Sequence, residues 1–386
     1  MLCAQRLICR YLEQVPFALL SGDALRKSAT AVWLVNIRKQ KDRFFLIIKI
    51  LIKRFLPPRT LFLFQKHDIR RAYLRAHLIV NRIKASPHSP FNQAPRIGYL
   101  RGIDFYKGSW LISTLASAMY NYRRSHGVYP NLLKPTYFDE KLLKSQFFTE
   151  LKVPESGNKL LASRFIPEDL KTSISVAKII WHSPIPKLPH NNEIMPGDYF
   201  LKASHGANMF QKIRYPLRED EFICLEKTCE KWLENKFGLS TGEWWYNTFQ
   251  KEILIEEQVG SQNNPISWHF YTFDGVIGHI MAHRKSDNDF RGEYSLFDED
   301  FEMLAYPKVP RPVKDICLTQ DTKNQLRRYA SSIGSQFRFA RVDFLVDDNQ
   351  KIYLGELTFC PGSAANLFFN DELQAYLGSL WSQECS

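Results

Sequence analysis

The chain has 386 residues, of which 45% are hydrophobic and 14% aromatic, so it can bury the cores of two or three domains and is not a disordered protein. Its formal charge of +12 is unevenly placed: residues 1–135 hold 24 Lys and Arg against 5 Asp and Glu, whereas residues 136–386 hold 28 against 35. The 7 cysteines form no C-x-x-C pair, which argues against a disulfide framework or a zinc ribbon and favours a reducing, cytoplasmic compartment.

The first part of the chain is expected to be basic and mainly helical. No apolar run reaches about 18 residues, so no ordinary transmembrane helix is predicted, and the opening segment lacks the features of a signal peptide. Residues 41–58, KDRFFLIIKILIKRFLPP, are different, because Lys49, Lys53 and Arg54 interrupt their apolar residues. Such a segment lies peripherally in the interface of the inner face of a membrane or packs as a helix of an N-terminal domain, and both interpretations stay open.

A second cationic run, residues 69–84, predicts an amphipathic helix with a solvated basic face. It carries no RNA-binding motif, zinc-ligand spacing or helix-turn-helix punctuation, so no nucleic-acid partner is expected. Prolines mark residues 84–95 as a linker, and residues 110–124 predict a short helix. The expected organisation is a basic helical region at 1–90, a connecting helical segment at 91–160 and a larger domain at 161–386.

From about residue 135 the pattern alternates between helix and strand. Helices are predicted at 139–151 and 219–238, and strands at 199–204, at 252–259 and within 269–283. His279 and His283 fall in the last of these segments, where residues four apart on a strand lie about 13 Å from each other. They are therefore interpreted as ordinary side chains rather than metal ligands. The expected fold class is α+β, with sheets that could clasp a nucleotide between them.

The most informative segment is RFARVDFLVDDNQKIYLGELTFCPG at 338–362, which predicts a β-hairpin with its turn at Asp347–Gln350. A pairing of Val346 with Lys351 would set Arg341 opposite Glu356 and Asp343 opposite Leu354. By alternation, four polar side chains would then share one face: Arg341, Asp343, Glu356 and Thr358. Such a face suits a Mg²⁺ site with phosphates nearby, and the competing interpretation is a solvated face with a cross-strand Arg341–Glu356 pair.

Several segments, taken in order, resemble the ATP-grasp proteins, and specifically their TupA-like branch, which is associated with teichuronopeptide and other polysaccharide biosynthesis. The matching segments are PTYFDEKL at 135–142, LASRF at 161–165, YFLKASHGA at 199–207, ILIEEQV at 253–259, FYTFDG at 270–275, and RVDFLVDDNQKIYLGELTFCPGS at 341–363. Ordered matches over about two-thirds of the chain are more specific than any single motif. The resemblance implies an ATP-grasp domain at 161–386, with two α+β lobes that clasp ATP.

The resemblance also assigns the nucleotide-binding residues. Lys202 would face the phosphates, and the loop that contains His205 and Gly206 would close over them. Arg164 stands where the family places an earlier lysine on the α-phosphate, so its charge is kept with a different geometry. A hinge would read adenine through Glu256, Glu257 and Val259. The sequence departs from the family at two places: the loop keeps only one glycine where several are usual, and Ser267 and His269 stand where the family commonly has an acid and a lysine.

Asp343 and Glu356 match the magnesium ligands of ATP-grasp enzymes, and Thr358 occupies the place of a further ligand. Arg341, Arg284 and Arg291 would face the transferred phosphoryl group and the substrate, as catalytic residues. The resemblance therefore implies a ligase that uses ATP and Mg²⁺ to join a carboxylate and an amine, each a small molecule or glycan-linked, through an acyl-phosphate. Two alternatives stay open: an ATP-dependent kinase of a sugar hydroxyl, and a non-catalytic nucleotide-binding scaffold of a glycan assembly complex.

Overall fold

A computed structural model describes the chain at residues 58–83, 110–148, 154–238, 241–260, 265–286, 289–304, 311–366 and 369–382. Met1–Gln65 and Lys66–Ser386 fall into two separate units, and the sheets and the candidate site belong to the second. The apolar segment at 41–58 lies outside the described residues up to its last proline. Within the described residues no helix is long and apolar enough to cross a membrane. The domain boundaries expected near residues 90 and 160 stay predictions.

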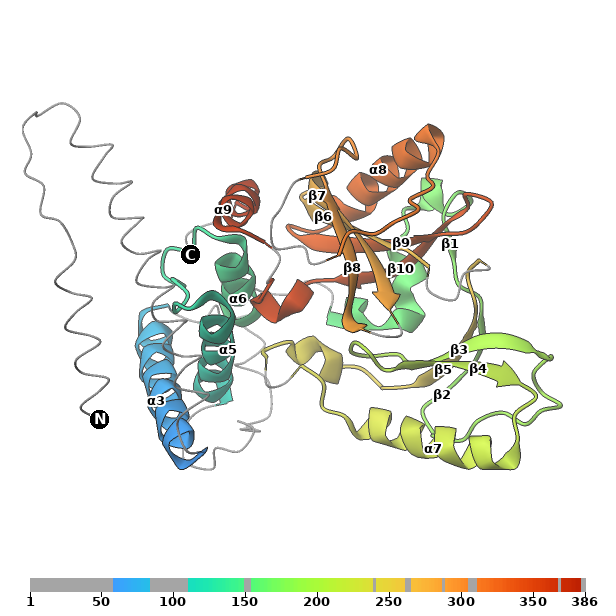
Figure 1. The fold of residues 1–386 in the computed structure, drawn as a ribbon, viewed down its shortest axis with the longest axis horizontal. Coiled ribbons are helices and arrows are strands. Elements are labelled where there is room, and N and C mark those ends of the chain that lie inside the picture. The colour runs from blue at the N-terminus through green and yellow to red at the C-terminus, as the bar shows by residue number, and fades with distance from the viewer. Residues whose placement is uncertain are drawn as a thin grey trace, which may run out of the picture. The chain divides into compact units, whose positions relative to one another are not determined.

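Two sheets organise the second unit, and they lie one above the other in Figure 1. The six-stranded sheet has the order β1-β10-β9-β6-β7-β8. Its strands are β1 (Ser175–Val176), β6 (Ser267–Phe273), β7 (Val276–Ser286), β8 (Asp289–Phe297), β9 (Ala340–Val346) and β10 (Ile352–Thr358). The four-stranded sheet has the order β2-β5-β3-β4, with β2 (Ile179–Ser183), β3 (Gly197–Ala203), β4 (Phe210–Tyr215) and β5 (Ile253–Glu257). All pairings are antiparallel except that of β1 with β10.

Helices cover the outer faces of the sheets. In Figure 1, α7 runs beneath the four-stranded sheet and α8 lies above the six-stranded one. The α-helices are α3 (Pro58–Arg82), α5 (Trp110–His126), α6 (Phe138–Phe148), α7 (Glu219–Glu234), α8 (Gln320–Gly334) and α9 (Asp371–Leu380). The 3₁₀ helices are η1 (Pro154–Gly157), η2 (Lys159–Phe165), η3 (Glu168–Leu170), η4 (Trp244–Asn247) and η5 (Pro361–Ala364). The predicted α+β class is confirmed, and the helices expected at 110–124, 139–151 and 219–238 are present with small differences at their ends.

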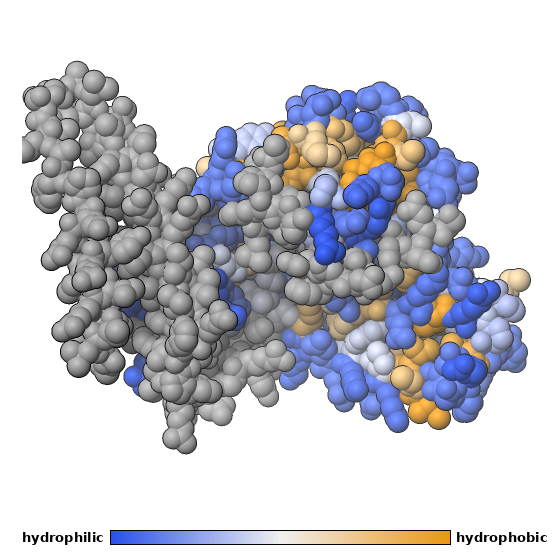
Figure 2. All heavy atoms as spheres, viewed as in Figure 1, coloured by the Kyte–Doolittle hydropathy of each residue, from blue (hydrophilic) through white to orange (hydrophobic). Residues whose placement is uncertain are grey.

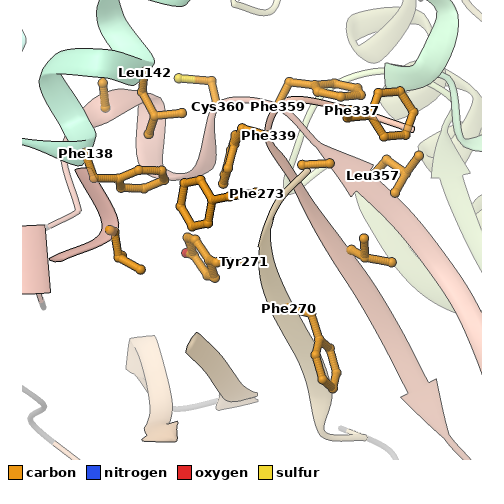
Figure 3. Packing of buried hydrophobic residues seen from close by; sticks show 14 of the residues in the cluster. Phe138, Leu142, Phe270, Tyr271, Phe273, Phe337, Phe339, Leu357, Phe359 and Cys360 are labelled. Carbon is orange, nitrogen blue, oxygen red and sulfur yellow. The ribbon is translucent and has the colours of Figure 1, made fainter. Parts of the chain in front are cut away.

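Each sheet has its own hydrophobic core, which is why the two can form distinct lobes. In the core of the six-stranded sheet, Phe138 of α6 packs its ring against those of Phe273 and Phe339, with 5.8 and 5.0 Å between ring centroids (Figure 3). Under the four-stranded sheet, Leu201 and Cys229 are fully buried between β3 and α7. In Figure 2 the surface of the sheet-bearing part is mainly hydrophilic with smaller hydrophobic patches, as is usual for a globular protein.

The register of the β9–β10 hairpin differs from the predicted one. Ile352 pairs with Val346, Leu354 pairs with Phe344, and a bulge at Gly355 then places Glu356 opposite Asp343 and Thr358 opposite Arg341. A bulge adds one residue to one strand, so Leu354 and Glu356 point to opposite faces although they are two positions apart. Leu354 enters the core at 2% exposure. The predicted grouping of the four polar residues on one face is therefore correct, whereas the partners predicted for Arg341 and Asp343 are wrong.

Candidate active site

A cavity of about 590 Å³ lies between the two sheets, which is a usual size for a small-molecule site. Its wall on the four-stranded sheet comes from β3, β4 and the loop at 204–209 that joins them. Its wall on the six-stranded sheet comes from β6, β7, β8, β9 and β10, and the segment around η5 closes one side. The polar residues that line it include Lys159, Lys202, Lys285, Arg341, Asp343 and Glu356.

Arg341 and the two acids form a compact cluster on β9 and β10. The Arg341 guanidinium donates to both carboxylate oxygens of Asp343, at 2.8 and 2.5 Å, and to Thr358 Oγ1 at 3.0 Å. Glu356 Oε1 lies 3.8 Å from Arg341 Nη2. Burial raises the pKa of Asp343 to about 7, although the guanidinium acts in the opposite direction. Burial acts to raise the pKa of Glu356, but the four nearby cations Lys159, Arg341, Lys202 and Lys285 together outweigh it, so the net change lowers that pKa and favours the anion.

Three lysines from different elements surround these acids. Lys159 Nζ, on η2, donates to Gly206 O at 2.6 Å and lies 3.7 Å from Glu356 Oε2. Lys202, on β3, pairs with Glu256 on β5. Lys285, on β7, places its ammonium 3.6 Å from the ring centre of Phe210, and burial lowers its pKa to about 8. The lysines thus give the cavity the positive charge that a phosphate chain requires.

Arg164 does not join this cluster. It is exposed on η2 and does not line the cavity, whereas Lys159 at the start of the same helix does. The two residues are five positions apart on a helix of three residues per turn, so their directions differ by roughly 120° around its axis. The structure therefore places Lys159 of this helix, and not Arg164, on the cavity wall, and the phosphate contact of Arg164 stays a prediction.

The loop between β3 and β4 reaches the cavity through Gly206, Ala207 and Asn208. Gly206 has a φ of +70°, and a Cβ there would lie 2.4 Å from Met209 Cε and 2.7 Å from Phe237 Cγ. His205 turns inward: it is fully buried, its Nε2 donates to Trp232 O at 3.1 Å, and burial lowers its pKa to about 4. His205 therefore anchors the loop from behind, and its predicted contact with the nucleotide is not supported by its position.

The predicted hinge borders a second, smaller cavity of about 70 Å³. Glu256 and Val259 line it, together with Leu345, Tyr353 and Gly355 from the β9–β10 hairpin. Glu257 points elsewhere, because neighbouring residues on a strand alternate in direction, and it forms a 3.3 Å ion pair with Lys178 at the surface. The structure thus brings two of the three predicted hinge residues to a cavity and leaves Glu257 outside.

Of the two other predicted catalytic arginines, only Arg284 has a described side chain, and it does not line the main cavity. Arg284 faces away from it on β7 and pairs with Glu293 at 3.5 Å, whereas its neighbours His283 and Lys285 line the wall. Because neighbouring residues on a strand point to opposite faces, Lys285 faces the cavity and Arg284 does not. Arg291 belongs to β8, and its side chain lies outside the described residues.

A comparison with models of known protein families identifies the family of the chain. A family model described as TupA-like ATP-grasp matches residues 189–382, about half of the chain. The chain belongs to the TupA-like ATP-grasp family. The match covers β3 to β10 and most of the cavity wall, and the expected ATP-grasp fold is confirmed. No curated protein matches the chain.

Solved ATP-grasp structures are similar to this TupA-like protein at low identity. The L-amino acid ligase from Bacillus licheniformis is 12% identical, with 64% of this chain and 58% of that one covered and a TM-score of 0.38. The D-alanine–D-alanine ligase from Bacillus anthracis, complexed with ATP, is 15% identical, with coverages of 54% and 57% and a TM-score of 0.34. The ATP-grasp ligase PsnB with its minimal precursor is 13% identical, with coverages of 58% and 60% and a TM-score of 0.31. The chain thus spans less than two thirds of the length of these structures.

The donor set of this TupA-like protein fits a magnesium ion that also contacts phosphates. Magnesium prefers oxygen ligands and is usually held by one or two carboxylates together with phosphates and water. Asp343 and Glu356 pair across the hairpin, both line the cavity, and Thr358 lies beside them. Within the described residues no group of three or more His, Cys, Asp and Glu could hold a metal ion by itself.

Sequence reasoning missed several residues that line the cavity of this TupA-like protein. Besides Lys159 and Lys285, the wall contains His269 and His283, whose rings lie 5.7 Å apart, and Tyr294, which stacks on His283 at 4.5 Å. His269 is buried, its Nε2 lies 2.9 Å from Ser267 Oγ, and Nδ1 has no hydrogen-bond partner in the described part of the chain. The alternation of side-chain directions along β6 and β7 predicts that Ser267, His269 and His283 share one face of the sheet. It does not predict that this face borders a cavity.

Proposed function

We propose that this protein is an ATP-dependent ligase that joins a carboxylate to an amine through an acyl-phosphate and releases ADP and phosphate. One observation carries the proposal: the cross-strand acids Asp343 and Glu356 share a cavity with Arg341, Lys159 and Lys202. Phosphoryl transfer leaves a protein little covalent work, so catalysis consists of positioning and charge neutralisation. Membership of the TupA-like ATP-grasp family supports the same conclusion.

The two cavities suggest how ATP would lie. The smaller one, beside Glu256 and Val259, would receive the adenine, whose edge can hydrogen-bond with a strand backbone. Lys159 and Lys202 would then neutralise the phosphates, and the amides around Gly206 would cover them. Magnesium, when held by Asp343 and Glu356 beside Thr358, would neutralise phosphate charge as well. Because Lys202 already pairs with Glu256, one contact would link the adenine end with the phosphate end.

The proposed reaction has two steps. An oxygen of the substrate carboxylate attacks the γ-phosphorus of ATP, and the bond to the β-phosphate oxygen breaks, which yields an acyl-phosphate and ADP. The amine then attacks the acyl carbon, phosphate leaves, and the amine loses a proton as the amide forms. Arg341 would stabilise the charge that develops on the transferred phosphoryl group, and its contacts with Asp343 on the cavity wall support this role.

We further propose that the substrates belong to cytoplasmic biosynthesis of a surface polysaccharide. The carboxylate and the amine would then come from an amino acid or peptide and from a sugar acid or amino sugar. The TupA-like family supports this assignment. The imidazole, phenol and hydroxyl groups of His269, His283, Tyr294 and Ser267 on the cavity wall are compatible with a polar substrate of this kind.

Product analysis tests the proposal. The full chain is incubated with magnesium, ATP and panels of carboxylates, with and without amines, and nucleotides are separated by chromatography. A ligase sustains ADP production beyond one equivalent of enzyme only when both substrates are present, and added hydroxylamine takes the place of the amine and traps the acyl-phosphate as a hydroxamate. Formation of AMP and pyrophosphate would contradict the proposal, and so would a stable phosphorylated sugar formed without an amine. Nucleotide binding without any turnover across the panels would favour the scaffold alternative.

A further inference from the structure

The exposed face of α3 combines arginines with leucines and contains no acid. From Asp68 to Arg82, the exposed residues are Arg70, Arg71, Leu74, Arg75, His77, Leu78, Asn81 and Arg82. At 100° per residue they occupy one continuous arc of roughly 160°, with Leu74 and Leu78 near its middle and arginines on both sides. We call this set the α3 face. It corresponds to the solvated basic face predicted for residues 69–84, and two apolar residues lie at its centre.

The opposite side of α3 is fixed by packing, so the α3 face points outward. Ala72 and Ala76 are fully buried, and Ile79 is 9% exposed. Asp68 pairs with Arg123 of α5 at 3.1 Å, and its carbonyl accepts a hydrogen bond from Tyr129 Oη at 2.9 Å. The only acid on this part of α3 is therefore engaged on the packed side.

The leucines and arginines of the α3 face remain available to a partner. Leu74 and Leu78 are 63% and 56% exposed, which is high for large apolar side chains. Arg75 lies 4.6 Å from the ring centre of Tyr129. In the described part of the chain no acid forms an ion pair with Arg70, Arg71 or Arg82. Four arginines thus lie around two exposed leucines, and no acid belongs to the α3 face.

We propose that the α3 face is a docking surface for an anionic lipid bilayer. Arginines keep their guanidinium groups at the level of lipid headgroups while their aliphatic stems accompany apolar neighbours inward. Each cation near such a surface contributes attraction, and the central leucines can enter the boundary between headgroups and acyl chains. A soluble polyanion would use the arginines but would gain little from two exposed leucines, which is why the arrangement favours a membrane.

The proposal is independent of the ligase chemistry and of residues 41–58. None of the residues of the α3 face lines either cavity. Membrane binding can therefore fail while ATP turnover persists, and the reverse also holds.

The test is sedimentation of the full chain with phosphatidylglycerol-containing vesicles and with neutral phosphatidylcholine vesicles. We expect binding only to the anionic vesicles, with loss between about 0.1 M and about 1 M salt, since the Debye length falls from about 10 Å to about 3 Å. The variant Arg70→Gln/Arg71→Gln/Arg82→Gln should bind about 100-fold more weakly, at about fivefold for each arginine. The variant Leu74→Ser/Leu78→Ser should also bind anionic vesicles more weakly, with unchanged binding to dextran sulfate.

The matched control is Arg214→Gln/Ile185→Ser, which changes an arginine and an aliphatic residue that are comparably exposed near the four-stranded sheet. It should bind vesicles as the wild type does, and thermal unfolding should confirm that all variants are folded. The proposal is overturned if the wild type does not bind anionic vesicles, or if the triple arginine variant binds as well as the wild type. It is also overturned if the leucine variant keeps full vesicle binding, because the surface would then be a site for a soluble polyanion.

Discussion

Arg341 donates two parallel hydrogen bonds to the carboxylate of Asp343, from Nε to Oδ1 at 2.8 Å and from Nη2 to Oδ2 at 2.5 Å. Two residues that are adjacent on one face of β9 thereby hold each other in a fixed geometry. The same guanidinium reaches Thr358 on β10, so it braces the hairpin as well as the cavity wall. Its position at the point where acids and lysines meet makes it the most informative residue to replace.

Replacement of Arg341 should affect turnover more than ATP affinity, because its proposed contact strengthens as phosphoryl charge develops. For Arg341→Lys we expect turnover to fall about 10²- to 10³-fold, while ATP affinity measured by calorimetry stays near that of the wild type. Arg338→Lys is the control, since this arginine pairs with Asp274 at 3.3 Å at the surface. An unchanged rate in Arg341→Lys would make Arg341 a structural brace of the hairpin only.

The two acids should make nucleotide binding depend on magnesium. In Asp343→Asn/Glu356→Gln, calorimetry with a non-hydrolysable ATP analogue should show that magnesium no longer strengthens binding, because carboxylate oxygens are the ligands that this ion prefers. Asp274→Asn, which alters an exposed acid of the β6–β7 turn, should keep the magnesium effect. Equal affinity of the double variant and the wild type with magnesium present would remove the metal assignment.

Lys159 and Arg164 allow a direct comparison of the structural and sequence assignments. Lys159→Met should weaken ATP binding about 10- to 100-fold, as expected when a charge-assisted contact is lost. Arg164→Met should leave the affinity unchanged, because Arg164 is exposed outside the cavity. The reverse result would show that the earlier phosphate cation is Arg164, and that η2 must turn when the nucleotide binds.

Gly206 should tolerate no side chain. Gly206→Ala combines a positive φ of +70° with a Cβ 2.4 Å from Met209 Cε and 2.7 Å from Phe237 Cγ. Gly127→Ala is a matched control, because Gly127 has a φ of +80° and no atom lies within 4 Å of the place that the added methyl group would occupy. Urea denaturation should show a loss of about 1 kcal/mol for the control from backbone strain alone, and a larger loss for Gly206→Ala. Similar losses in the two variants would mean that the loop relaxes without cost.

Glu243 should make stability depend on pH. Burial raises its pKa from 4.5 to about 7, although its carboxylate accepts hydrogen bonds from Thr241 and Ser363. Between those two values the native state holds a proton that the unfolded state has released, so the free energy of unfolding should fall as the pH rises. The expected slope is up to about 1.4 kcal/mol for each pH unit. Glu243→Gln should remove this part of the slope in urea titrations at several pH values, and an unchanged slope would refute the assignment.

The sequence by itself determined where the helices and strands lie and which face of each is apolar or polar. The period of the apolar residues located α5, α6 and α7, and the alternation on the hairpin put Arg341 and Asp343 on one face and Val342 and Phe344 on the other. These features depend on neighbours within a few positions, where propensity and periodicity act directly. The ordered motifs also identified the family, because they preserve the spacing of a whole domain.

Only the tertiary structure decided which side chains meet. The bulge at Gly355 set the partners across the hairpin. The orientations of η2 and β7 put Lys159 and Lys285 on the cavity wall and left Arg164 and Arg284 off it. These outcomes depend on how two lobes with separate cores face each other across a cavity, which no local pattern encodes. A strand or helix prescribes which residues share a face, but the long-range packing of the lobes prescribes which face becomes the site.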